Sequence, residues 1–159
     1  MKQLNLIRLF SALAICFLAA GIGTFFTTDA INGWYATLNK PFFNPPNWLF
    51  GPVWTLLYTL MGISLYLVWQ KKNKTVLKKI SMIVFFIQLG LNTLWSIIFF
   101  GYKLPPAAFI EIILLWVSIF LTIKYFKKIS PIAAALLYPY IAWVSFAAIL
   151  NAAIVVLNT

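Results

Sequence analysis

The chain has 159 residues, of which 64% are hydrophobic and only 9% charged, and its mean hydropathy is +0.97. Soluble domains carry about 25% charged residues, so a chain this depleted in charge must have lipid as its main solvent. A membrane-spanning helix needs about 20 apolar residues, and the length therefore allows five spans but no separate soluble domain. We expect an all-α membrane protein, a five-transmembrane-helix bundle that forms a single domain over residues 1–159.

The chain offers few reactive side chains. It has no histidine, one cysteine (Cys16) and two acids, Asp29 and Glu111. This inventory excludes Ser/His/Asp and Cys/His catalysis, a zinc site and a disulfide within the chain. We therefore expect no metal site and no required cofactor.

The net charge of +10 is typical of nucleic-acid binding, but the basic residues fall in short loops between apolar runs. There they act as topology signals, so we expect the lipid bilayer, and no nucleic acid, as a partner.

Five apolar runs follow one another along the chain. They predict spans at about residues 6–28, 48–69, 80–100, 106–123 and 131–157. A cleaved secretory signal is the alternative for the first run, but its apolar residues continue through Phe25 and Phe26, beyond the length of a signal core. The prolines at positions 41, 45 and 46 exclude a continuous helix after it, so we expect residues 29–47 to be a non-helical lid loop. Pro139 is expected to kink the fifth span.

The basic residues are distributed unevenly between the two ends of the predicted bundle. Ten of the twelve fall on one side: Lys2, Arg8, Lys71, Lys72, Lys74, Lys78, Lys79, Lys124, Lys127 and Lys128. Only Lys40 and Lys103 fall on the other. Because cytoplasmic loops carry an excess of lysine and arginine, this split predicts a cytoplasmic N-terminus and an external C-terminus.

The third span carries polar residues that do not suit a lipid-facing surface. Asn92 lies near its middle, where an unpaired amide would lose its hydrogen bonds. Gln88 lies four residues before it and Trp95 three after, so all three project from one helical face. One interpretation is that the amides bond across a helix interface, which contributes about 0.6 kcal/mol on average. The other is that this face borders a cavity.

Similar stripes occur on two other spans. Trp54 and Tyr58 are four residues apart on the second, and the fifth carries Tyr140, Trp143, Ala147 and Asn151 at helical spacing. A single aromatic stripe usually packs in a core. Three stripes that each combine tryptophan with tyrosine, asparagine or glutamine indicate a concave, mostly apolar pocket with a few orienting polar groups.

Glu111 is the only acid inside a predicted span. A carboxylate within a membrane is a functional candidate, for example in proton coupling. Its place soon after Pro105 and Pro106 instead predicts a position near the outer interface, within reach of water or Lys103. We expect a structural role, since no further ionisable partner accompanies it within the spans.

Three stretches carry a family resemblance. They read WYATLNKPFFNPPNWLFGPVWTLLY, QLGLNTLWSIIFFG and SPIAAALLYPYIAWVSFAAILN. In order and spacing they closely resemble the TspO/MBR family of tryptophan-rich sensory proteins and translocator proteins, also called peripheral benzodiazepine receptors. The three stretches cover more than a third of the chain. The resemblance implies a five-helix bundle, often a homodimer, with a ligand cavity beneath the first loop.

The resemblance also implies a ligand class. Members bind porphyrins, notably protoporphyrin IX and haem, and synthetic isoquinoline carboxamide and benzodiazepine ligands. The implied ligand-binding positions, with the aromatic residues around them, are Trp34, Trp48, Trp54, Tyr58, Gln88, Asn92, Trp95, Tyr140, Trp143 and Ala147. The implied lid contains Lys40, Pro41, Pro45 and Pro46, with Lys40 placed to pair a propionate.

The resemblance leaves the activity open between three alternatives. A binding or sensory protein is the leading one. Bacterial relatives are associated with light-dependent porphyrin breakdown, for which Trp54 and Trp143 would be the catalytic residues, and a tetrapyrrole transporter is the third. Cholesterol is not an expected ligand, because Ala152 stands where the recognition motif needs a tyrosine and no basic residue follows. The short basic N-terminus suits a bacterial plasma membrane protein.

Overall fold

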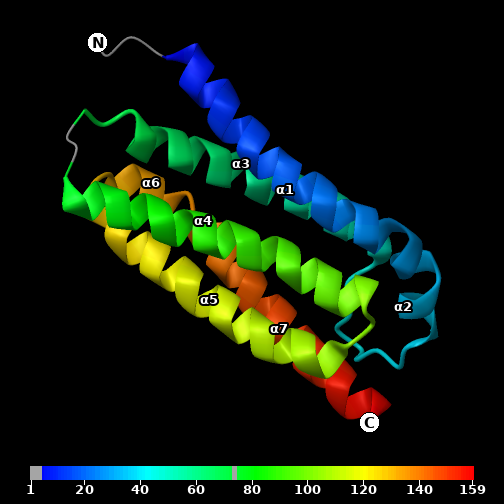
Figure 1. Cartoon of the computed structure of the whole chain (residues 1–159). Coiled ribbons are helices and arrows are strands. Elements are labelled where there is room, and N and C mark those ends of the chain that lie inside the picture. Colours follow the sequence, from blue (N-terminus) through cyan, green and yellow to red (C-terminus); the bar gives the residue numbers. More distant parts are fainter. Residues whose placement is uncertain (1–4, 73–74) are drawn as a thin grey trace.

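The computed structural model describes residues 5–72 and 75–159 (Figure 1). Its helices are α1 (Leu6–Asn32), α2 (Trp34–Thr37), α3 (Asn47–Trp69), α4 (Val76–Ser96), α5 (Pro105–Lys127), α6 (Pro131–Ala135) and α7 (Tyr138–Asn158), with a π-helical segment η1 (Ile97–Gly101) directly after α4. Five apolar helical segments are long enough to cross a membrane: Leu6–Asn32, Asn47–Trp69, Val76–Gly101, Pro105–Lys127 and Pro131–Asn158. The predicted all-α, five-span fold is confirmed.

The helices pack as an antiparallel bundle. In Figure 1 the start of α1, the end of α3, the start of α4 and α6 lie at one end, while α2 and the C-terminus lie at the other. Helix α1 packs along α3 and α4, and α5 packs between α4 and α7. Phe85 and Phe126 stack across the α4–α5 contact with their centroids 5.6 Å apart. The Ser64 hydroxyl donates to the carbonyl oxygen of Ala133 at 2.7 Å and ties α3 to α6.

Glycines show where α1 and α3 approach and where they separate. A Cβ added at Gly62 would lie 2.7 Å from Leu13 Cδ2 and 3.0 Å from Leu13 Cα, so α1 and α3 touch there with no room for a side chain. At Gly21 and Gly51 the same added atom would meet nothing within 4 Å. Helices α1 and α3 are therefore in close contact where Leu13 meets Gly62, and they leave space between them toward the α2 end of the bundle.

The helix bounds differ from the predictions at several ends. Helix α1 continues to Asn32 and α2 follows one residue later, so residues 29–47 are not a wholly non-helical loop. No proline precedes Pro41, and nothing before Gly33 interrupts the helical hydrogen bonds. Helix α4 begins at Val76 because the Thr75 side chain caps it, accepting from the Lys78 amide at 3.3 Å. Lys78 and Lys79 therefore belong to the helix, not to the loop.

The C-terminal end of the fourth span also extends further than predicted. Helix α5 continues to Lys127, with Lys124 and Lys127 in its last turn. Cations there interact favourably with the carbonyl end of the helix dipole. Two predicted loop cations, Lys2 and Lys74, lie outside the described residues.

The expected kink at Pro139 is a break between two helices. Helix α6 ends at Ala135 and α7 begins at Tyr138, which places Pro139 in the first turn of α7. A proline is tolerated there because the amides of a first helical turn have no intrahelical partner. The change in direction therefore precedes Pro139 and requires no broken hydrogen bond within α7.

Candidate ligand cavity

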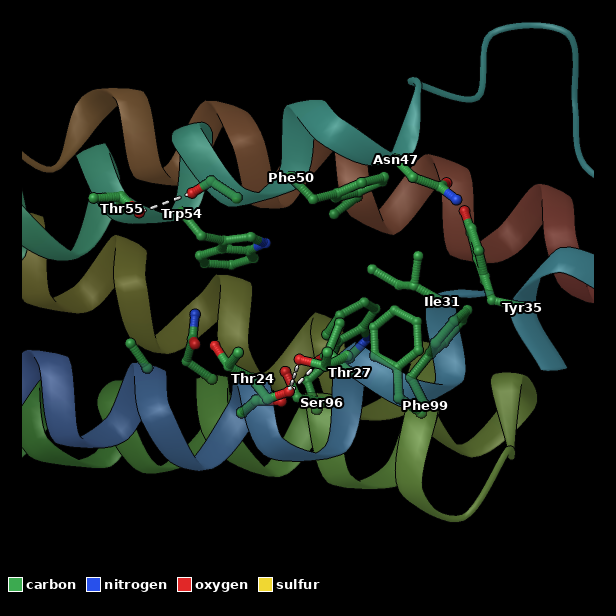
Figure 2. A pocket seen from close by; sticks show the side chains of 18 of the residues that line it. Thr24, Thr27, Ile31, Tyr35, Asn47, Phe50, Trp54, Thr55, Ser96 and Phe99 are labelled. Carbon is green, nitrogen blue, oxygen red and sulfur yellow. Dashed lines mark hydrogen bonds between the residues drawn. The ribbon is translucent and has the colours of Figure 1, made fainter. Parts of the chain in front are cut away.

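A cavity of about 760 Å³ lies between α1, α3, α4 with η1, and α7. Figure 2 shows Trp54 and Phe50 projecting from α3 across this space toward Thr24 and Thr27 of α1 and Phe99 of η1. Small-molecule sites in proteins usually occupy about 300–1,000 Å³. The cavity is therefore large enough to hold a drug-sized molecule.

Aromatic rings form much of its wall. Trp54 lies against Tyr58 with a centroid distance of 5.7 Å, and Phe50 meets Trp143 edge to face at 6.1 Å. On the opposite side Trp95 stacks on Phe99 at 5.0 Å and 22°. Rings held by other rings in this way keep their orientation, so the cavity presents fixed, flat apolar surfaces.

A hydrogen-bonded chain closes the cavity at its deep end. The Tyr58 hydroxyl donates to Asn92 Oδ1, and Asn92 Nδ2 donates to the Tyr140 oxygen at 2.7 Å. Tyr58 and Asn92 border the cavity, whereas Tyr140 is fully buried behind them. The Asn92 amide thus joins α3, α4 and α7, and both of its polar ends are satisfied as a buried polar group requires.

The remaining polar wall is neutral. Among the described residues, those that line the cavity include no lysine, arginine, aspartate or glutamate. The hydroxyls of Thr27 and Thr55 donate to carbonyl oxygens of their own helices, at Gly23 (2.8 Å) and Gly51 (2.9 Å). By contrast, Trp143 Nε1 is buried without a hydrogen-bond partner among the described residues. The cavity wall is therefore mostly apolar, with a few uncharged polar groups.

The first loop covers the α2 end of the cavity. The Tyr35 hydroxyl lines the cavity and donates to Asn44 Oδ1 at 2.6 Å, which holds the loop against α2. Burial raises the pKa of Tyr35 to about 12, so this donor keeps its proton at neutral pH. Asn39 is held by Asn158 at the end of α7, with Asn39 N donating to Asn158 Oδ1 at 3.0 Å. The loop is thus attached at two points.

The sequence of the chain is similar to those of known proteins. A sequence profile of the TspO/MBR family matches residues 12–157. The chain belongs to the TspO/MBR family. It is 46% identical to the tryptophan-rich protein TspO of Archaeoglobus fulgidus over 98% of this chain and 99% of that protein. It is 42% identical to TspO of Chlorobaculum tepidum, over 97% of this chain and 98% of that protein. It is 38% identical to human translocator protein over 84% of this chain and 82% of that protein.

Most of the aromatic and polar residues predicted for the ligand site of this TspO/MBR member line the cavity. They are Trp48, Trp54, Tyr58, Asn92, Trp95, Trp143 and Ala147. Helical spacing identified all of them except Trp48, because residues three and four apart share a face, and the three faces do converge.

Three predicted residues lie outside the cavity wall. Trp34 packs edge to face on Phe99 at 5.7 Å and supports the wall from behind. Tyr140 supports Asn92, as described above. Gln88 shares the face of Asn92 but lies one turn deeper, where the cavity has ended, and both of its amide atoms are buried without a partner among the described residues. Spacing predicted the direction of Gln88 and Tyr140 correctly but not their depth.

The predicted lid lysine does not face the cavity. Lys40 Nζ donates to the carbonyl oxygens of Tyr35 (2.8 Å), Ala36 (3.3 Å) and Leu38 (3.1 Å). It also lies 5.0 Å from the centroid of the Tyr35 ring. These bonds satisfy the carbonyl end of α2, so the Lys40 ammonium stabilises the lid and is not placed to pair a ligand. Pro41, Pro45 and Pro46 lie in the loop between α2 and α3 but do not line the cavity.

Helix α1 supplies a wall that was not predicted. Gly21, Thr24, Thr27, Thr28 and Ile31 all line the cavity. The only signal was the recurrence of glycine and threonine at helical spacing, which is hard to recognise in a helix whose other residues are apolar all round.

The prediction that Glu111 reaches water or pairs with Lys103 is wrong. Glu111 is only 5% exposed, and both carboxyl oxygens are buried without a hydrogen-bond partner among the described residues. Six residues into α5 correspond to a depth of about 9 Å, which takes the side chain below the interface. It shares the inward face of α5 with Ala108 and Leu115.

Proposed function

We propose that this membrane protein binds porphyrins, such as protoporphyrin IX and haem, in the cavity between α1, α3, α4 and α7. The supporting observation is a neutral cavity of about 760 Å³ whose wall contains the rings of Trp54, Trp95 and Trp143. A tetrapyrrole is flat and largely apolar, and it gains both buried area and ring stacking against such a wall. Isoquinoline carboxamide and benzodiazepine-type ligands also carry flat, apolar aromatic rings that can pack against the same wall.

The neutral wall also bears on how a porphyrin is oriented. A carboxylate buried without a partner is strongly disfavoured. The propionates should therefore remain at the α2 end, where the exposed residues Asn32 and Asn47 line the cavity beneath the first loop. The apolar edge of the macrocycle then points toward Asn92. This orientation requires no ion pair with Lys40, whose ammonium is bonded to α2.

Titration of the purified protein with protoporphyrin IX, followed by tryptophan fluorescence, tests the proposal. We expect saturable quenching in the wild type and both weaker quenching and weaker affinity in a Trp54→Phe/Trp143→Phe variant. Trp69→Phe is a matched control, because Trp69 is about 22 Å along α3 from Trp54 and does not line the cavity. Unchanged affinity in the double variant, or equal loss in the control, would contradict the site.

Light-dependent porphyrin degradation is the second candidate function. It is favoured by the position of Trp54 and Trp143 in the wall, because an indole can donate an electron to an excited porphyrin. The lining residues offer no acid–base pair, so any reaction here must run through light, oxygen and the indoles. Illuminated porphyrin should then yield a defined product over many turnovers. Decay no faster than in detergent with free tryptophan would exclude this activity and leave binding intact.

A further inference from the structure

Asn151 connects three helices at the wall of the cavity. It is 1% exposed and lies two turns after Trp143 on α7. Its Oδ1 accepts from Trp95 Nε1 of α4 at 3.2 Å, and its Nδ2 donates to the carbonyl oxygen of Pro105, the first residue of α5, at 2.9 Å. Both ends of the amide are therefore engaged, and the direction of the amide group is set by its two partners.

The hydrogen bond from Trp95 to Asn151 fixes the orientation of the Trp95 ring in the cavity wall. Stacking on Phe99 at 5.0 Å and the edge contact with Phe100 at 5.8 Å hold the plane of the Trp95 ring. Stacking alone would also permit the ring turned by 180° about its Cβ–Cγ bond, which keeps the ring plane but reverses the edge that carries the N–H. The hydrogen bond removes this freedom, because it fixes the direction of the indole N–H. It also occupies the donor that a bound ligand would otherwise reach.

The indole N–H groups of Trp95 and Trp143 thus differ in their hydrogen bonding, although both residues line the cavity. The Trp95 donor is occupied by Asn151, whereas Trp143 Nε1 has no hydrogen-bond partner within residues 5–72 and 75–159. We propose that Asn151 is a positioning residue of the ligand site, which holds the Trp95 indole so that it presents a flat apolar surface, not a hydrogen-bond donor, to a planar aromatic ligand. This inference rests on the proposed function only for its binding measurement.

The hydrogen bond itself is tested without any ligand. In protein with isotope-labelled tryptophan, the Trp95 indole N–H resonance is assigned by its loss in Trp95→Phe. Asn151→Leu should shift that resonance while leaving the Trp69 and Trp116 resonances in place. Asn151→Gln moves the amide by one methylene and should shift it as well, which provides a second variant if Asn151→Leu does not fold. An unmoved Trp95 resonance in a folded variant would overturn the proposal.

A double-mutant comparison separates positioning of Trp95 from simple tethering of α5. Asn151→Leu should raise the Kd for protoporphyrin IX by about tenfold in the wild-type background, as expected for one lost buried hydrogen bond. In the Trp95→Phe background it should have little further effect, because there is no indole N–H to hold. An equal loss in both backgrounds means that Asn151 acts through Pro105 alone, and the proposal is wrong. If the wild type does not bind porphyrin, the proposed function fails while the resonance measurement still decides the role of Asn151.

Discussion

Asn158, in the last turn of α7, holds the backbone of Asn39, which lies 119 residues earlier in the first loop. Asn39 N donates to Asn158 Oδ1 at 3.0 Å, and Asn158 Nδ2 donates to the Asn39 carbonyl oxygen at 2.9 Å. The pair reproduces the two-way bonding of a backbone ladder. It fastens the loop that covers the cavity to the helix that carries Trp143.

Loss of this pair should speed ligand release. In Asn158→Ala the loop keeps its Tyr35–Asn44 bond but loses both Asn158 bonds to Asn39, so that only the 3.3 Å bond from Asn39 Nδ2 to the Leu157 carbonyl oxygen still ties it to α7. We expect the dissociation rate of protoporphyrin IX to rise by about three- to tenfold, as for one or two exposed hydrogen bonds. Stopped-flow displacement measures this rate. Asn39→Ala is the matched control with a smaller effect, because it removes only the 3.3 Å side-chain bond to Leu157 and spares the backbone bonds. An unchanged rate in Asn158→Ala would mean that the loop does not limit release.

The contact between Gly62 and Leu13 should be intolerant of a side chain. Gly62→Ala would place a methyl group 2.7 Å from Leu13 Cδ2, and the Leu13 backbone behind it cannot move away easily. We expect overpacking to destabilise the protein by about 1–3 kcal/mol, seen as a lower unfolding temperature in detergent. Gly51→Ala is the control, since nothing lies within 4 Å of the added atom. Equal stability of the two variants would show that α1 can shift along α3.

Much of the fold and part of the site were predictable from the sequence, and the misses share a physical cause. Helical periodicity reveals which side chains share a face, and so it brought Trp54, Asn92 and Trp143 together correctly. It does not reveal how deep each residue lies, which is why Gln88 was misplaced. The bonds made by Lys40 could not be predicted, because they depend on the carbonyl groups of α2, a four-residue helix that the neighbouring prolines concealed.

The chain formed by Tyr58, Asn92 and Tyr140 should contribute to stability. Asn92→Leu has a similar volume but leaves the Tyr58 donor and the Tyr140 oxygen without their shared partner. Unpaired polar groups of this kind cost about 1–3 kcal/mol, so the unfolding temperature should fall. Because Asn92 lines the cavity, ligand affinity should fall as well. Tyr58→Phe leaves the Asn92–Tyr140 bond in place and should cost less. Wild-type stability in Asn92→Leu would show that the chain is not a structural element.

Replacement of Glu111 by glutamine should leave both stability and ligand binding nearly unchanged. The carboxyl group has no hydrogen-bond partner among the described residues and does not line the cavity. Glutamine keeps its shape and cannot ionise, which removes the cost of burying a charge. We expect an unfolding temperature equal to or above that of the wild type and a Kd for protoporphyrin IX within about twofold. Glu111→Leu tests whether any polar group is needed there. A large loss of affinity for protoporphyrin IX in Glu111→Gln would assign the carboxyl group a role in ligand binding.

The two ends of the bundle should face different compartments. Arg8, Lys71, Lys72, Lys79, Lys124, Lys127 and Lys128 lie at or near the ends of their helices on the side that holds the start of α1, the end of α3 and the start of α4 (Figure 1). Lys40 and Lys103 lie toward the opposite side, with α2 and the C-terminus. Since short cytoplasmic loops retain basic residues, we expect the N-terminus in the cytoplasm and the C-terminus outside. A phosphatase that folds only outside the cytoplasm should be active when fused after Thr159 and inactive when inserted after Lys72. Phosphatase activity after insertion at Lys72, with none after fusion at Thr159, would mean that the orientation is reversed and that the α2 end of the cavity lies at the cytoplasmic face.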